Sequence, residues 1–119
     1  MTVLAVMPGK KPTKMELEGT LEAMQAFVGG RIQAIYPFDD PVAIVCNEEG
    51  KMMGLEYNRA LRDEKGVIYD ILCGPFFVCG LGEADFASLP ESLMETYHKL
   101  FERPELFVMA GGNLVIMRV

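Results

Sequence analysis

The residues of this chain that could contact a small ligand gather around one central segment. Tyr36 precedes a proline-flanked loop, and Asn58 and Arg59 follow a predicted strand. An aromatic ring stacks on a flat ligand, a guanidinium binds carboxylate or phosphate through its planar fork, and an asparagine amide matches an amide-like edge. The three residues would hold a nucleotide-like ligand if they converge on one concave surface. The alternative is structural, with Asn58 capping a turn and Arg59 paired with Asp63 or Asp70.

The carboxylates and the single histidine form no catalytic or metal-binding pattern. Asp39 and Asp40 are adjacent, and neighbouring side chains of an extended chain point opposite ways, so the pair is more typical of a turn before Pro41. His98 has no nucleophile or oxyanion-binding element close to it in the sequence. We therefore expect no metal and no cofactor, and we lean against an enzyme.

Cysteine usage and hydropathy predict a cytoplasmic protein. The three cysteines, Cys46, Cys73 and Cys79, are odd in number and irregularly spaced, which is typical of buried free thiols rather than a disulfide framework. No apolar run approaches the ~20 residues that span a bilayer. The apolar start of the chain has no basic region before it, so we read it as a first strand and not as a signal peptide. We expect no membrane partner.

The charge balance argues against direct nucleic-acid binding. Seventeen acidic residues against eleven basic ones give a net charge of −6. A nucleic-acid-binding protein usually carries a basic face, and the only basic cluster here is Lys10, Lys11 and Lys14.

Two helices are predicted from their ends. Thr20 can cap a helix whose apolar face is followed by Gly29, a residue suited to the left-handed C-terminal position. Ser88 and Glu91 have the spacing of a capping box, which predicts a second helix that stops at Arg103 and Pro104.

Between and around the helices, the pattern predicts short strands. "NEEGK" is typical of a hairpin turn with Gly50 in the left-handed position, and "RDEKG" of a second hairpin turn with Gly66. The predicted strands cover residues 2–7, 14–17, 31–36, 42–46, 51–56, 59–61, 67–72 and 76–79, with two more about an Ala-Gly-Gly-Asn turn near the end. The fold class is therefore α+β, a mainly antiparallel sheet with hairpins packed by two helices.

We expect a single globular domain over residues 1–119, with residues 105–119 as an accessory C-terminal β-hairpin. Its sequence is "ELFVMAGGNLVIMRV". If its own sheet does not cover it, its apolar face or open edge would pair with another chain. The partner would be a host protein or a second copy of this chain.

A longer pattern resembles a known family. The segments are "MTVLAVMPGKKPTKMELEGTLEAMQAFVGGRIQAIYPFDDPVAIVCNEEGKMMGLEYNRAL" and "GVIYDILCGPFFVCGLGEADFASL". Together they resemble the family of uncharacterised domains numbered 3846 over roughly residues 1 to 100. The resemblance implies a small cytosolic protein of Gram-positive gut bacteria, their phages and conjugative elements, often encoded near antirestriction or mobilisation genes. It implies no activity, cofactor or catalytic residue.

Three functions follow in order of preference. The first is a non-enzymatic accessory protein of a mobile genetic element that binds another protein. The second is binding of a small nucleotide-like ligand between Tyr36, Asn58 and Arg59. The third is a small hydrolase that uses a cysteine or an aspartate, which ranks last because no catalytic constellation supports it.

Overall fold

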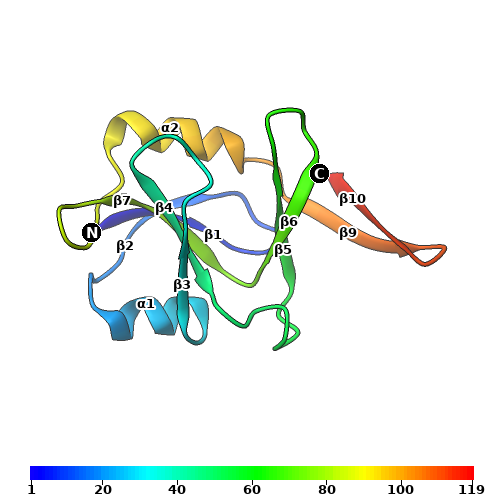
Figure 1. The fold of residues 1–119 in the computed structure, drawn as a ribbon, viewed down its shortest axis with the longest axis horizontal. Coiled ribbons are helices and arrows are strands. Elements are labelled where there is room, and N and C mark those ends of the chain that lie inside the picture. The colour runs from blue at the N-terminus through cyan, green and yellow to red at the C-terminus, as the bar shows by residue number, and fades with distance from the viewer.

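The computed structural model describes all 119 residues and has the predicted α+β architecture. Figure 1 shows a central sheet between two helices, a two-stranded β5–β6 unit beside it, and a hairpin projecting from that end. Along the chain the elements are β1 (Thr2–Val6), β2 (Thr13–Glu16), α1 (Leu21–Val28), β3 (Ile32–Ile35), β4 (Val42–Asn47), β5 (Tyr57–Arg62), β6 (Ile68–Cys73), β7 (Phe76–Leu81), β8 (Phe86–Ala87), α2 (Glu91–Leu100), β9 (Glu105–Ala110) and β10 (Asn113–Arg118). Neither helix is both long and apolar enough to cross a membrane.

The central sheet is antiparallel throughout. Its strands lie in the order β2-β1-β7-β4-β3, and the short β8, which the sequence did not predict, pairs with β7. Val78 of β7 lies opposite Leu4 of β1 on one side and Ile44 of β4 on the other. Because side chains alternate along a strand, the largely buried strands β1, β4 and β7 supply apolar residues to both faces of the sheet.

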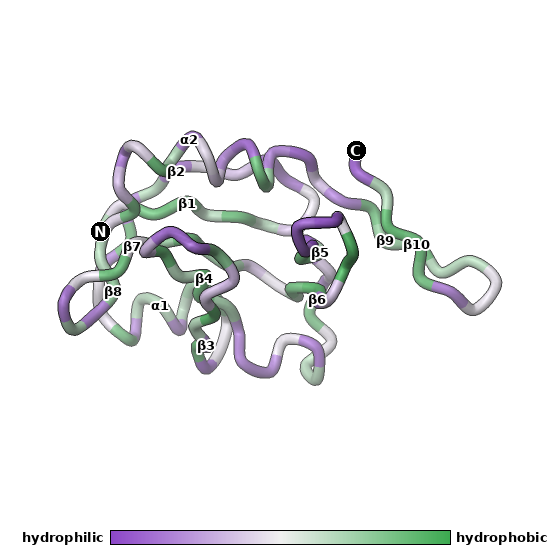
Figure 2. Tube along the Cα trace, turned by 45° about the horizontal axis from the view of Figure 1, so that its top comes forward, coloured by the Kyte–Doolittle hydropathy of each residue, from purple (hydrophilic) through white to green (hydrophobic).

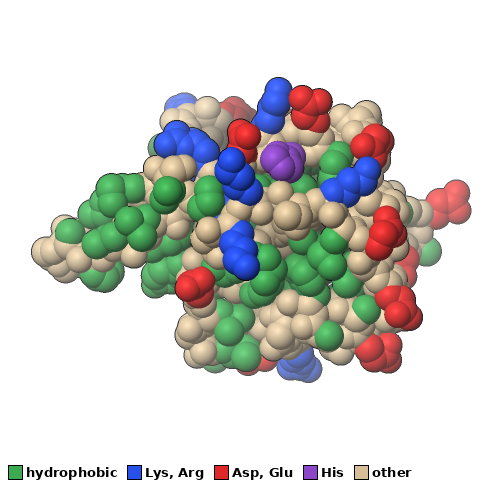
Figure 3. Space-filling model, turned by 180° about the vertical axis from the view of Figure 1, so that it is seen from behind, with side chains coloured by type: hydrophobic (Ala, Val, Ile, Leu, Met, Phe, Trp, Pro, Cys, Tyr) green, Lys and Arg blue, Asp and Glu red, His purple; other side chains and the backbone are tan.

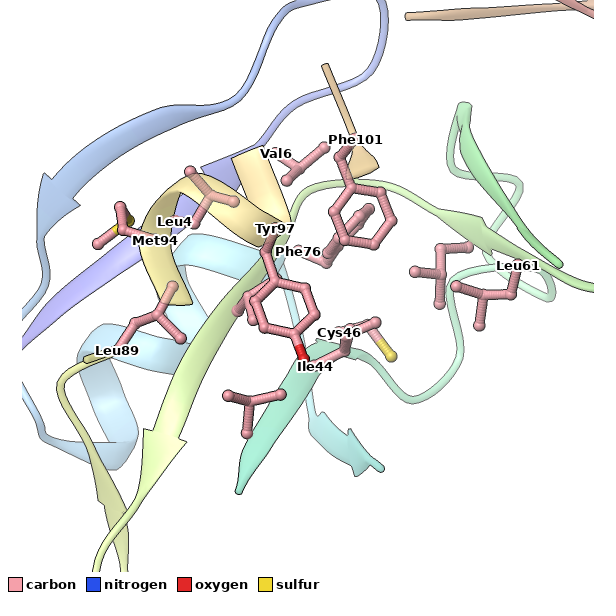
Figure 4. Packing of buried hydrophobic residues seen from close by; sticks show 13 residues of the cluster. Leu4, Val6, Ile44, Cys46, Leu61, Phe76, Leu89, Met94, Tyr97 and Phe101 are labelled. Carbon is pink, nitrogen blue, oxygen red and sulfur yellow. The ribbon is translucent and has the colours of Figure 1, made fainter. Parts of the chain in front are cut away.

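Each face of the sheet is covered by one helix. On one face, α2 contributes Met94 and Tyr97 to a cluster of 13 buried residues, several of which are labelled in Figure 4. On the other face, α1 contributes Met24 and Val28 to a cluster of seven. Burying a large apolar side chain of this kind contributes about 1.5–3 kcal/mol, so the two clusters are the main favourable term that holds the helices on the sheet.

The ends of α1 are as the sequence predicts. Thr20 Oγ1 accepts a hydrogen bond from the Ala23 N–H at 3.2 Å, and Gly29 has a left-handed φ of 80°. The next glycine serves a different purpose, because a Cβ on Gly30 would lie 2.9 Å from Asn47 Nδ2. That amide donates to the Val28 carbonyl at 3.1 Å, so Gly30 makes room for a bond that ties β4 to the end of α1.

The capping box predicted for α2 is wrong. The helix begins at Glu91 with Pro90 as its N-cap and no side-chain capping bond. Ser88 Oγ instead accepts from the Thr2 N–H at 2.9 Å, and Glu91 pairs with Lys14 at 2.9 Å. Both side chains therefore serve contacts with the first two strands.

The predicted hairpin at "NEEGK" is also wrong. Residues 48–56 form turns and no return strand, and β4 pairs with β3 and β7 instead. Gly50 does not have a positive φ; the left-handed glycine of this loop is Gly54, at 70°. Gly50 is required for space, because a Cβ there would lie 2.8 Å from the Cys73 carbonyl oxygen. The second hairpin is confirmed: β5 and β6 are joined by a turn with Gly66 at a φ of 80°.

The C-terminal strands form the predicted hairpin. β9 and β10 pair along their whole length. Glu105 lies opposite Arg118 at the base, and Ala110 lies opposite Asn113 at the turn, which contains two glycines of positive φ. The base of the hairpin contacts β5 through the rings of Tyr57 and Phe107, 5.2 Å apart, and through a largely buried Arg62–Glu105 ion pair at 2.8 Å.

Candidate functional site

The three residues predicted to bind a ligand do not share a surface. Asn58 and Arg59 are fully buried in β5, whereas Tyr36 lies beyond the end of β3 and is 61% exposed. The amide of Asn58 donates to the carbonyls of Val6 and Gly74 at 2.9 and 2.8 Å. Asn58 therefore fastens β5 to the ends of two neighbouring segments.

The guanidinium of Arg59 is fully occupied inside the protein. Nε and Nη2 donate to the Phe101 carbonyl at 3.2 and 3.0 Å, and Nη2 also donates to the Lys10 carbonyl at 2.5 Å. Nη1 donates to the Oδ1 and backbone oxygen of Asn58 at 2.9 and 3.2 Å. Burial lowers the pKa of Arg59, yet the charge is favourable beside Phe101 because the C-terminal end of α2 is the negative end of its dipole.

Asn58 and Arg59 therefore have a structural role, as the alternative to ligand binding predicts. The partners that the alternative gave to Arg59 are wrong. Arg59 pairs with neither Asp63 nor Asp70. Asp63 Oδ1 accepts from two N–H groups of its own turn, those of Lys65 and Val67, both at 2.9 Å. Asp70 pairs with Lys51.

The surface best suited to binding lies along β6 instead, and we call it the β6 groove. It consists of a cavity of about 770 Å³ and an adjoining one of about 240 Å³, which share Lys51, Asp70, Ile71 and Cys73. The loop of residues 48–56 forms the opposite wall, and it can do so because it does not return as a strand. Figure 1 shows this loop running from the end of β4 to the start of β5.

The walls of the larger cavity are apolar and exposed. Tyr57, Ile68 and Tyr69 are 44%, 41% and 57% exposed, and Leu55 lies beside them. Large apolar side chains at the surface of a concave site are typical of a binding surface. Tyr57 also touches Phe107 of the C-terminal hairpin, so the groove ends where the hairpin begins.

The backbone of β6 is open along this groove. β6 pairs with β5 on one side and with no strand on the other. The Ile71 N–H donates to its neighbour's carboxylate, Asp70 Oδ1, at 2.8 Å. An open strand edge beside an apolar cavity is the geometry into which an extended peptide adds as a further strand.

One ion pair crosses the groove. Lys51 Nζ donates to Asp70 Oδ1, and both side chains are substantially exposed, at 61% and 41%. Burial alone would raise the pKa of Asp70, but hydrogen bonds from Lys51 and Ile71 outweigh it and the net pKa is lowered; the same pair raises the pKa of Lys51. Both groups are therefore charged at neutral pH, and because they are exposed their attraction is weak enough for a ligand to separate them.

Comparison with known proteins places this fold in a family. The model of the Domain of unknown function (DUF3846) matches residues 1–102. The chain belongs to the DUF3846 family. The matched region contains both helices and the whole β6 groove, whereas β9 and β10 lie outside it. No curated protein and no solved structure matches the chain.

A separate cavity of this DUF3846 protein, of about 1090 Å³, lies beside Asp39 and Asp40. The two aspartates do not act as a pair. The Tyr97 hydroxyl donates to Asp40 Oδ2 at 2.6 Å, and burial together with that bond raises the pKa of Tyr97. Asp40 therefore anchors α2 to the β3–β4 loop.

The three cysteines of the DUF3846 protein are free and buried, as the sequence predicts. Burial raises the pKa of Cys46 to about 11 and that of Cys79 to about 12, and it also raises the pKa of Cys73. Nucleophilic attack requires the thiolate, so these side chains are inert at neutral pH. The structure holds no group of three or more potential metal-ligating side chains.

Proposed function

We propose that this protein is a non-enzymatic binding protein that takes an extended segment of a partner protein into the β6 groove. The observation that carries the proposal is the open edge of β6 beside a cavity of about 770 Å³ with exposed apolar walls. In strand addition, the main chain of the peptide supplies hydrogen bonds and pockets for alternate side chains supply selectivity.

The charges around the groove indicate what the partner segment carries. Four carboxylates line the two cavities, those of Glu48, Glu49, Glu56 and Asp70, against the single ammonium of Lys51. The net charge of −6 has the same sign. Complementary charge speeds association and suppresses wrong partners. The segment is therefore one in which aliphatic or aromatic residues alternate with lysine or arginine.

The setting in this proposal is the cytoplasm, with the protein an accessory factor of a mobile genetic element and the partner a protein of its host. Three free thiols are typical of a reducing compartment, which supports the location. The element and the host partner are proposed from the family resemblance, and the groove supplies the physical means of binding.

Small-ligand binding is the second candidate, and the size of the same cavity favours it. A volume of about 770 Å³ lies in the range of roughly 300–1,000 Å³ that is typical of small-molecule sites. Tyr57 and Tyr69 could stack on a planar ligand. The carboxylates around Lys51 disfavour a phosphate group there, so a nucleotide fits the groove less well than a basic peptide does.

The test measures peptide binding by fluorescence anisotropy. The probe is a labelled peptide of about eight residues, the length of an ordinary strand, in which lysine alternates with valine and phenylalanine. A second probe has glutamate in place of lysine. Tyr69→Ser removes a groove wall, and Tyr36→Ser is the matched control because it removes an equally exposed tyrosine outside the groove.

We expect the lysine peptide to bind and the glutamate peptide not to bind. Tyr69→Ser should weaken binding at least about fivefold, since a buried aromatic contact is the usual anchor of an interface, while Tyr36→Ser leaves it unchanged. Equal binding of the two peptides, or equal effects of the two variants, contradicts the proposal. A small-molecule mass retained in native mass spectrometry and lost in Tyr69→Ser favours the second candidate.

A further inference from the structure

The C-terminal hairpin carries an unusual stretch of uncharged surface. It projects from the body, and in Figure 3 its outer part is green and tan, with the charged side chains on the body and near its base. No charged residue lies between Glu105 and Arg118. Figure 2 shows the same hairpin as predominantly hydrophobic along both strands. It lies outside the residues that the family model matches.

The two faces of the hairpin are covered to different degrees. One face carries Leu106, Val108, Val115 and Met117, which are 37–49% exposed. The other carries Phe107, packed on Tyr57 of the body, and Leu114 and Ile116, which are more covered than their strand neighbours. Of the apolar residues on this face, only Met109, near the turn, is strongly exposed. A two-stranded hairpin is marginal in water, and this one leaves an apolar face open.

The outer edge of β10 is equally unprotected. β9 lies between β10 and β5, while no strand pairs with the other side of β10. Natural edge strands are guarded by lysines, prolines or bulges, and residues 113–117 contain none of these. Ala110 and Asn113 close a two-residue turn, so they form a hydrogen-bonded pair. Hydrogen-bonded and non-hydrogen-bonded pairs alternate along an antiparallel ladder, so the N–H and C=O groups of Leu114 and Ile116 point away from β9, toward the open edge.

We infer that a second copy of this chain covers this edge: two β10 strands pair antiparallel about a twofold axis and form a four-stranded sheet, β9-β10-β10-β9. Residues opposite each other in such a pair must lie on the same face. Centring the axis on Val115 meets this condition. Val115 then faces its own copy, and Leu114 of each chain faces Ile116 of the other.

The hairpin is the part of the surface where two copies of this acidic chain can meet without electrostatic repulsion. The chain has a net charge of −6, so two copies repel each other over most of their surfaces. The hairpin is where two copies can meet without opposing carboxylates, and its projection keeps the acidic bodies apart. A twofold contact also needs only one self-complementary patch, which an uncharged alternating strand provides. The inference is independent of the β6 groove, so either can fail alone.

The first experiment is sedimentation velocity on the full chain over a range of about 5 to 200 μM, because a contact limited to one hairpin is at the small end of specific interfaces. The wild-type protein should shift from monomer to dimer over this range. Val115→Lys should weaken the dimer at least about tenfold by opposing two ammonium groups. Val67→Lys places the same change on an exposed residue of the β5–β6 turn and should behave as wild type.

A cross-linking experiment tests the register. Val115 in the proposed pair is a non-hydrogen-bonded position facing itself, where Cα atoms lie about 4.5 Å apart and Cβ atoms close enough for a disulfide. Val115→Cys oxidised with diamide should give a covalent dimer, and Val108→Cys, on β9 away from the axis, should not. The native cysteines are buried and do not compete. A wild-type chain that is monomeric at the highest concentration, or a dimer unaffected by Val115→Lys, overturns the inference; cross-linking of both cysteine variants alike overturns the register.

Discussion

Replacing Arg59 by methionine should destabilise the protein by about 3–5 kcal/mol, because it leaves several buried carbonyl oxygens without a donor. The side chain is fully buried and donates to four acceptors: the carbonyls of Phe101, Lys10 and Asn58 and the Oδ1 of Asn58. Each buried acceptor left without a donor costs about 1–3 kcal/mol. Methionine keeps most of the aliphatic volume and avoids burying a guanidinium, which offsets part of that sum.

The measurement is equilibrium urea unfolding followed by far-UV circular dichroism. Arg59→Lys separates charge from geometry: it keeps the positive charge, but one ammonium cannot reach Phe101, Lys10 and Asn58 together, so we expect more than half of the methionine loss. Arg31→Met, at an exposed position, is the control and should change stability by no more than about 0.5 kcal/mol. If Arg59→Met costs less than about 1 kcal/mol, the hydrogen bonds described above do not hold β5 to α2 and the β1–β2 turn.

Three further predictions concern the thiols and a glycine. Ellman's reagent at pH 8 should find essentially no reactive thiol in the native protein and three in urea, because burial raises the pKa of every cysteine; two or more native thiols would refute this. The free energy of unfolding should fall as the pH rises from about 9 to 11. In the unfolded chain Cys46 loses its proton near its ordinary pKa of 9.0, whereas in the native protein its pKa is about 11, so the native state binds more protons in that window. Urea midpoints that stay level from pH 9 to 11 would contradict this. Gly50→Ala should lower the free energy of unfolding by about 1–3 kcal/mol, since the new Cβ lies 2.8 Å from the Cys73 carbonyl oxygen. Gly19→Ala is the control and should be neutral, because its new Cβ meets open space. Equal urea midpoints for the two variants would be inconsistent with the contact at Gly50.

The sequence predicted the features that depend on neighbouring residues. Thr20 and Gly29 mark the ends of α1 because a helix cap bonds to groups within its own turn. The turn at Gly66 and the C-terminal hairpin were predicted for the same reason. Their determinants lie within a few residues of one another, so no knowledge of the rest of the fold was needed.

The errors arise where a distant residue competes for the same group. Ser88 has the spacing of a capping residue, but its hydroxyl is taken by the N–H of Thr2, 86 positions away. Arg59 has the composition of an anion-binding site, but its partners Lys10 and Phe101 are 49 and 42 positions away. Local pattern cannot distinguish a guanidinium that waits for a ligand from one that binds carbonyls of the same chain.

The β6 groove was missed for a related reason. The sequence pattern predicts a strand over residues 51–56 paired with β4, and a strand there would leave no cavity beside β6. In the structure, Asn47 ends β4 by accepting from the Glu49 N–H at 2.8 Å while donating to the end of α1. The chain then leaves the central sheet as a loop. The signal that could have found this is the pair of adjacent methionines and the glycine at residues 52–54, which have no alternation.

The two open strand edges differ in a way that matches their proposed partners. The edge of β6 is crossed by the exposed Lys51–Asp70 ion pair and bordered by carboxylates, so it resists chance pairing with other strands. A partner must separate that pair and supply opposite charge, which suits a selective and reversible contact. The edge of β10 has no such guard, and an unguarded apolar edge invites aggregation unless it is covered. A symmetric pairing of two copies covers it without extending into a fibre, because a twofold contact uses up the edge of both chains. We therefore propose that the uncharged hairpin and the charged groove serve different associations, one between copies and one with a partner.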